Sequence, residues 1–149
     1  MIQLPDFSKA FEYENNFYLS CDNTRFSKFL AHYELFKMIK DLPGAMVECG
    51  VYKGASFVRF AGLRSLFEIP QSRKLLGFDT FGKFPQTKYK DDKKYRDKLV
   101  QISGEQSISK EQLLAVLKNK GVDKNTELIE GNVIKTVPEY LKKNPHLKI

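Results

Sequence analysis

The 149-residue sequence predicts an α/β fold, in which a parallel sheet carries helices on both faces. Three observations favour this class. Short apolar runs alternate with amphipathic segments, an order that right-handed crossovers join into parallel strands. Helix-capping residues flank several of the amphipathic segments. The length favours one domain with its own core, and no internal repeat or flexible linker divides the chain.

The first predicted helix begins near Thr24, where Asp22 or Thr24 can cap it, and ends at the Leu-Pro-Gly of residues 42–44. Its apolar stripe consists of Phe26, Phe29, Leu30, Tyr33, Phe36 and Ile39, at spacings of three and four residues. The run "AMVECG" (residues 45–50) predicts a buried strand. Residues 55–69 predict the helix that follows, with Pro70 as its stop.

Two more strand–helix pairs follow. The run "KLLGFDTF" (residues 74–81) predicts the second strand, and "TELIEGNV" (residues 126–133) predicts the third. The helix between them has capping-box spacing at Ser109 and Gln112. A last helix has the same spacing at Thr136 and Glu139, with Pro138 in its first turn. The final "HLKI" predicts the opening of a fourth strand.

Residues 82–104 form a polar, lysine-rich excursion between the second strand and the Ser109 helix. Its weak periodicity predicts one short helix around residues 93–102. Loops of this length are usually functional or mobile.

Charge and cysteine content bound the partners and the compartment. The net charge of +7 is spread over helix ends and loops, which indicates solvated faces and makes a nucleic-acid partner unlikely. No apolar run is long enough to cross a membrane, and the N-terminus does not resemble a signal peptide. The two cysteines, Cys21 and Cys49, suit a reduced, cytoplasmic setting.

The stretch "AMVECGVYKGAS" (residues 45–56) places two glycines after the first predicted strand. Only three residues separate Gly50 from Gly54, so the stretch does not match a phosphate-binding P-loop. Tyr52 occupies the middle glycine position of a dinucleotide fingerprint, where it would obstruct a pyrophosphate. The remaining pattern suits either an ordinary tight turn or a cofactor that has no pyrophosphate.

An adenosyl amino acid such as S-adenosylmethionine is one such cofactor. Gly50 permits a sharp turn, Gly54 permits close packing, and the following helix N-terminus with Ser56 offers donors to a carboxylate. Glu48 can hold an ammonium group, directly or through water. Asp79, at the end of the second strand, can accept hydrogen bonds from ribose hydroxyls, and the Asn132 amide can reach an adenine edge. Capping and plain turns are the alternative roles of these last two residues.

The chain resembles the macrocin and mycinamicin sugar O-methyltransferases from about residue 29 to residue 149, excepting the excursion. The resemblance rests on "ECGVYKGAS", on "FDTFGKFP" and on "ELIEGNVIKTVPEYLKKNPHLKI". It implies S-adenosylmethionine-dependent methylation of a hydroxyl, on a sugar or other small-molecule or glycan acceptor, within a Rossmann-like methyltransferase fold. It also implies about four strands in the order 3-2-1-4, with an N-terminal helical lead-in (residues 1–44) before a cofactor-binding half-domain (residues 45–149).

By this resemblance the cofactor site comprises Glu48, Cys49, Gly50, Val51, Gly54, Ser56, Asp79, Thr80, Gly131 and Asn132. The family commonly has aspartate where this chain has Asn132. Family members continue past the equivalent of Ile149 into segments that bind Mg²⁺ and deprotonate the acceptor. We therefore expect neither metal ligands nor catalytic residues within this chain, and consider His32 and His146 structural or exposed. A homo-oligomer, or completion by another polypeptide, is expected. The alternative function is a truncated, non-catalytic remnant or interaction module.

Overall fold

The structure is a computed structural model that describes residues 2–69 and 72–149. Pro70, the predicted helix stop, lies outside the described residues. The elements are η1 (Phe7–Lys9), α1 (Ala10–Ser20), α2 (Asn23–Ile39), β1 (Met46–Cys49), α3 (Ala55–Phe67), β2 (Leu75–Asp79), α4 (Lys90–Ser103), α5 (Lys110–Asn119), β3 (Thr126–Glu130) and α6 (Val133–Lys143).

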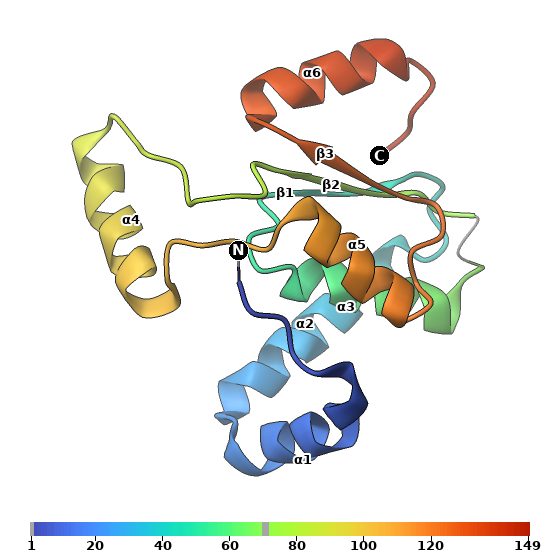
Figure 1. Cartoon of the computed structure of the whole chain (residues 1–149). Helices are drawn as coiled ribbons and strands as arrows, with labels where there is room; N and C mark the ends of the chain where they lie inside the picture. The colour runs from blue at the N-terminus through green and yellow to red at the C-terminus, as the bar shows by residue number, and fades with distance from the viewer. Residues whose placement is uncertain (1, 70–71) are drawn as a thin grey trace.

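The three strands form one parallel sheet in the order β1-β2-β3, as strand–helix alternation predicts. Met46 pairs with Leu75, and Asp79 pairs with Glu130, so the carboxyl ends of the strands lie together. Helix α6 covers one face of the sheet, while α3 and α5 cover the other (Figure 1). This arrangement confirms the predicted fold class.

The prediction of about four strands is wrong for this structure. Within the described residues no strand follows α6, and the sheet has three members. The terminal segment still approaches the free edge of β1, because the Ala45 N–H donates to the Lys148 carbonyl at 2.8 Å. A single hydrogen bond of this kind is not enough to form a strand pair.

Two apolar clusters, one on each face, hold the layers together. The larger contains Phe57 and Ala61 of α3, Leu113 and Leu117 of α5, and the side chain of Leu75, all at most 2% exposed. The smaller joins Ala45, Leu76 and Phe78 to the inner side of α6. Leu75 and Leu76 point to opposite faces, as consecutive strand residues must.

Helix α2 begins after Asp22, whose side chain accepts from the Thr24 N–H, so Asp22 is the cap. Of the predicted apolar stripe only Phe36 is buried, whereas Phe29 and Leu30 are 47% and 57% exposed. The C-terminal half of the helix packs on α3, with Tyr33 and Phe36 against Phe67. In the N-terminal half, the Phe26 ring packs against Phe17 and Tyr18 of α1.

The final helix also differs from the prediction. Asn132, rather than Thr136, caps α6 by accepting from the Ile134 N–H at 3.0 Å. The helix therefore starts at Val133, and Pro138 lies in its interior. By contrast, both hydrogen bonds of the predicted Ser109–Gln112 capping box are present at the start of α5.

Helix α4 confirms that the excursion contains a helix, which is longer than predicted and stands away from the sheet (Figure 1). Its base is held firmly. Lys83 and Gln106 form an isolated antiparallel β-bridge, and the Phe84 N–H donates to the Glu105 carbonyl at 2.8 Å. The Arg96 guanidinium donates to the carbonyls of Phe84 and Pro85 and to the Glu105 carboxylate. None of the described helices is both long and apolar enough to cross a membrane.

Candidate functional site

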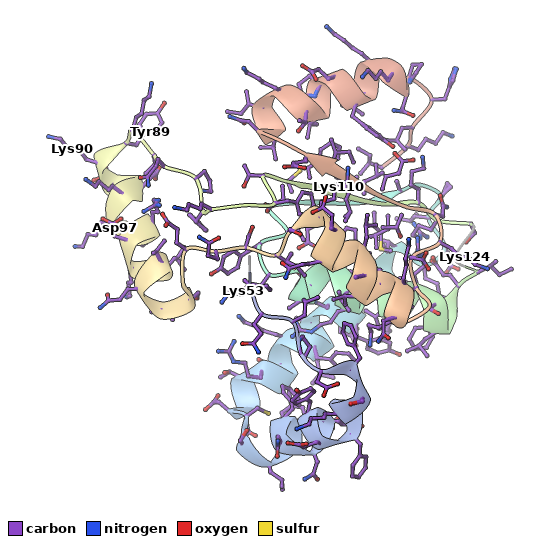
Figure 2. All side chains as sticks on the ribbon, in the orientation of Figure 1. Lys53, Tyr89, Lys90, Asp97, Lys110 and Lys124 are labelled. Atoms are coloured by element: carbon purple, nitrogen blue, oxygen red, sulfur yellow. The ribbon has the colours of Figure 1, made fainter. Side chains whose placement is uncertain are left out.

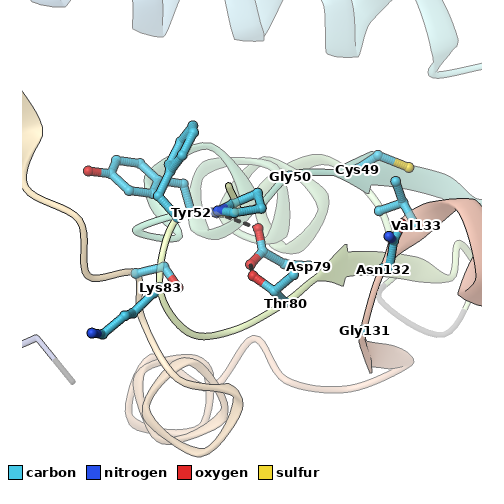
Figure 3. A pocket seen from close by; sticks show the side chains of 12 residues that line it. Cys49, Gly50, Tyr52, Asp79, Thr80, Lys83, Gly131, Asn132 and Val133 are labelled. Carbon is cyan, nitrogen blue, oxygen red and sulfur yellow. Dashed lines mark hydrogen bonds between the residues drawn. The ribbon is translucent and has the colours of Figure 1, made fainter. Parts of the chain in front are cut away.

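A hollow of about 570 Å³ lies at the carboxyl ends of the three strands (Figure 3). Ligands of open α/β sheets bind at this end, where the connections diverge. The hollow brings together six of the predicted site residues. These are Cys49, Gly50, Asp79, Thr80, Gly131 and Asn132.

Asp79 organises the floor of the hollow. Its Oδ2 accepts from the Tyr52 N–H at 3.0 Å and its Oδ1 accepts from the Phe81 N–H at 2.8 Å. Tyr52 and Phe81 both have positive φ, 53° and 49°, so the carboxylate supports two turns in a conformation that non-glycine residues rarely adopt. Oδ1 also accepts from the Thr80 hydroxyl at 3.4 Å, so Oδ2 is the oxygen that keeps a further lone pair, with which it can accept a hydroxyl of a ligand.

Gly50 forms the edge of the hollow where β1 ends. Its N–H donates to the Phe78 carbonyl at 2.8 Å, and its φ is +89°. A Cβ atom built on Gly50 would have no heavy atom within 4 Å. The backbone there is therefore open to close approach by a ligand.

Gly131 and Asn132 form the third side of the hollow. The Gly131 N–H donates to the Asp79 carbonyl at 2.9 Å, which ties this turn to the floor. The Asn132 oxygen is engaged in capping α6, so its NH₂ group is left to donate. The capping role and a ligand role for Asn132 are thus compatible.

Glu48 and Ser56 do not line this hollow. Glu48 shares the face of β1 that Met46 occupies, and it lines a separate apolar hollow with Leu35, Ile39 and Phe60. The Ser56 hydroxyl donates to Glu48 Oε1, and Oε2 is buried without a partner among the described residues. Burial raises the pKa of Glu48; the Ser56 hydrogen bond opposes that shift and the charge of Asp79 adds to it.

Val51 and Gly54 are likewise outside the hollow. Val51 is a core residue, 3% exposed. Gly54 caps α3 with φ +82°, and a Cβ there would come within 3.1 Å of Leu113 Cδ1. Core packing explains Val51, and turn geometry explains Gly54. Both explanations agree with the alternative that this stretch is an ordinary tight turn.

Sequence reasoning missed the wall that faces the excursion. It consists of Tyr52, Lys83, Phe84, Pro85 and Ser107, with Val133 opposite. The Tyr52 ring meets Phe84 edge-on at 5.9 Å, and its hydroxyl donates to the carbonyls of Ser103 and Gly104 at the end of α4. Two signals pointed to this wall, namely the length of the excursion and the stretch "FDTFGKFP", which contains Lys83, Phe84 and Pro85.

Residues that would suggest other chemistry are not at the hollow. His32 stacks on Phe60 at 4.9 Å, on the side of α2 and α3. Within residues 2–69 and 72–149, no group of three or more His, Cys, Asp or Glu side chains is placed to hold a metal ion.

Comparison with known proteins identifies relatives for most of the chain. The family model of macrocin O-methyltransferase (TylF) matches residues 23–147. The apo structure of CalS11, a TDP-rhamnose 3′-O-methyltransferase of calicheamicin biosynthesis, is 28% identical with a TM-score of 0.59, and the match covers 94% of this chain and 55% of that one.

A second crystal structure, of the calicheamicin methyltransferase CalS11, is 27% identical with a TM-score of 0.60 over 91% of this chain and 56% of that one. The chain therefore spans about half the length of the solved structures that it matches. The search of curated proteins gave no match.

Proposed function

Since the chain belongs to the macrocin O-methyltransferase family, we propose that it binds S-adenosylmethionine and takes part in methylating a hydroxyl of a sugar-containing small molecule. The similarity to a TDP-rhamnose 3′-O-methyltransferase supports a sugar acceptor. Residues 45–149 would form the cofactor-binding half-domain, with residues 1–44 as a helical lead-in.

The observation that carries this proposal is the convergence of Gly50, Asp79 and Asn132 on one hollow. The open backbone at Gly50 suits the methionine end, the spare lone pair of Asp79 Oδ2 suits a ribose hydroxyl, and the Asn132 NH₂ suits an acceptor nitrogen of adenine. Glu48 and Ser56 do not line this hollow. We therefore assign the methionine end of the cofactor to the backbone of residues 49–52 instead.

S-adenosylmethionine supplies an electrophilic methyl group when bound. The residues of the hollow would fix its position: Asp79 orients the ribose, and the Tyr52–Phe84 wall restricts water on the side of the excursion. We assign no residue of the hollow the role of catalytic base. Deprotonation of the acceptor, with Mg²⁺ where the family uses it, would be supplied by the part of the family fold that this half lacks.

Completion of the fold would occur along β1, through a homo-oligomer or another polypeptide. Within the described residues β1 pairs as a strand only with β2, and Leu35, which lines an apolar hollow together with Met46 and Val47, is 54% exposed. Unpaired edges with exposed apolar neighbours favour association. Light scattering tests this: a single well-folded monomer at all concentrations would contradict it.

Calorimetric titration with S-adenosylmethionine and S-adenosylhomocysteine tests cofactor binding directly. Saturable binding that adenosine alone weakens by competition supports the proposal, and no heat of binding at millimolar cofactor contradicts it. Turnover of TDP-rhamnose with Mg²⁺ then separates an active enzyme from the non-catalytic alternative, which predicts cofactor binding without product.

A further inference from the structure

A second hollow, of about 320 Å³, continues from the first one onto α4. The two share Phe84 and Pro85 as lining residues. The second is lined further by Gln86, and by Asp92, Tyr95 and Leu99 of α4. Phe84 and Pro85 thus separate this hollow from the candidate cofactor hollow, where the Phe84 ring contacts Tyr52.

This second hollow has fixed walls. Arg96 binds the carbonyls of Phe84 and Pro85 from within α4, at 3.3 and 2.9 Å, and so sets the distance between the helix and the loop. The C-terminal end of α4 is held by Tyr52, through the carbonyls of Ser103 and Gly104. Since the helix is anchored at its middle by Arg96 and at its C-terminal end by Tyr52, the hollow is part of the folded excursion.

The lining combines apolar faces with free hydrogen-bonding groups. Tyr95 and Leu99 are 72% and 50% exposed, although a stripe of this kind would normally be buried. Among the described residues, the side chains of Gln86 and Asp92 make no hydrogen bond or ion pair. An aromatic ring beside a carboxylate and an amide matches a pyranose ring, whose C–H face packs on the aromatic ring while its hydroxyls donate to the oxygens.

The lysines of α4 lie elsewhere. Lys90, Lys93, Lys94 and Lys98 line a separate depression together with Asp97 and Gln101, and Lys90 points away from the sheet (Figure 2). The second hollow itself offers one free carboxylate, while Arg96 is already paired with Glu105. This charge favours the neutral sugar ring of an acceptor over its phosphates.

We propose that the hollow formed by Pro85, Gln86, Asp92, Tyr95 and Leu99 is the acceptor subsite and binds a six-membered sugar ring. The inference rests on the proposed function, because a methyl acceptor has to reach the cofactor hollow. It adds the location of the acceptor, on the excursion rather than over the sheet, and the residues that recognise it.

The test is nuclear magnetic resonance titration of the full chain with TDP-rhamnose, methyl α-rhamnoside and TDP. We expect both sugar-containing probes to shift the backbone signals of Asp92, Tyr95 and Leu99, and TDP alone to leave them unmoved. The change Tyr95→Ala should weaken sugar binding about fivefold, and Asp92→Asn about tenfold.

Two matched controls lie in the same helical turn or beside it. Tyr89→Ala removes a tyrosine that is 75% exposed and outside the hollow, and Asp91→Asn removes the neighbouring carboxylate of the same turn. Equal losses for control and test variants, shifts that map elsewhere, or no binding of either sugar probe would overturn the subsite. Binding of S-adenosylhomocysteine is followed in parallel: its failure contradicts the proposed function, whereas the subsite is judged by the sugar titration alone.

Discussion

Ser56 and Glu48 form a hydrogen-bonded pair that does not line the cofactor hollow, with the Ser56 hydroxyl donating to one carboxylate oxygen. The other oxygen, Oε2, is buried without a partner among the described residues. Only one of the two carboxylate oxygens of Glu48 therefore accepts a hydrogen bond that stabilises the ionised form. Its protonation state is therefore coupled to the stability of the fold.

The change Glu48→Gln should stabilise the chain at neutral pH relative to acidic pH. Burial raises the folded-state pKa of Glu48 above its ordinary value, so the folded chain binds the proton more tightly than the unfolded chain does. Stability from this group is fully present below the ordinary pKa and is lost as pH rises through the folded-state pKa. The glutamine variant does not titrate, so its advantage should grow across that window.

Urea unfolding of both proteins between about pH 4 and pH 8 measures this difference, a range that begins near the ordinary carboxyl pKa and extends above it. Ser56→Ala is the companion variant: it removes the hydrogen bond that lowers the pKa, and so should move the window to higher pH. A glutamine variant that is less stable than the parent at neutral pH would show that the ionised form of Glu48 is the favoured one.

The change Asp79→Asn should weaken both the fold and the cofactor site. In the variant an NH₂ group takes the place of one of the two oxygens that accept from the Tyr52 and Phe81 N–H groups. One of these backbone N–H groups then faces the NH₂ group and loses its acceptor, which should lower the free energy of unfolding by about 1–3 kcal/mol. Urea unfolding measures the cost, and calorimetry with S-adenosylhomocysteine should show affinity reduced about tenfold. Glu130→Gln is the control, since Glu130 pairs with Asp79 in register but is exposed; an equal loss there would contradict a specific role for Asp79.

Two glycine-to-alanine substitutions should change the free energy of unfolding in opposite directions. A Cβ on Gly77 of β2 would lie 2.9 Å from both Leu128 Cδ2 and Phe57 Cε2, so Gly77→Ala should lower the free energy of unfolding by about 1–3 kcal/mol. Gly62 of α3 has open space at its Cβ, so Gly62→Ala should raise it by about 0.5–1 kcal/mol. Thermal unfolding ranks the three proteins, and a stable Gly77→Ala variant would mean that β2 packs less tightly than described.

Arg64→Lys should destabilise the chain by about 2–3 kcal/mol although the charge is retained. The fully buried guanidinium donates to the carbonyls of Arg73, Val122, Lys124 and Asn125, and so joins α3 to the turns that precede β2 and β3. An ammonium group has three donors and cannot span these oxygens. Arg59→Lys, in the same helix, should change the free energy of unfolding by less than about 0.5 kcal/mol, and equal effects of the two changes in urea unfolding would contradict this role.

The parallel sheet and most helix starts were predictable because their signals are local. Apolar runs define the three strands. Asp22 and Ser109 cap helices because their side chains accept from the backbone N–H groups of Thr24 and Gln112, within the first turn of each helix. The start of α6 was mispredicted because Asn132 and Thr136 both offer caps, and only tertiary packing chooses between them. Helix α1 was not predicted, and it contains no buried residue that would give it a periodic pattern.

The site was predictable where it depends on strand ends and not where it depends on side-chain direction. Asp79 and Asn132 converge because parallel strands bring their carboxyl ends together. Glu48 follows Met46 by two positions and so faces the same layer, a parity that conflicts with a role beside Cys49. The contribution of Phe84 and Pro85 depends on how the excursion folds back, which no local pattern encodes.

Tyr52 is fastened at three points: its N–H to Asp79, its ring against Phe84, and its hydroxyl to the last carbonyls of α4. The turn that would cradle one reactant and the arm that would present the other are thus joined through Tyr52, and the neighbouring Lys53 ammonium group also donates to the Ser103 carbonyl. Phenylalanine at position 52 would keep the ring and remove both hydroxyl contacts, so that Lys53 alone would carry the side-chain hydrogen bond from this turn to the end of the arm.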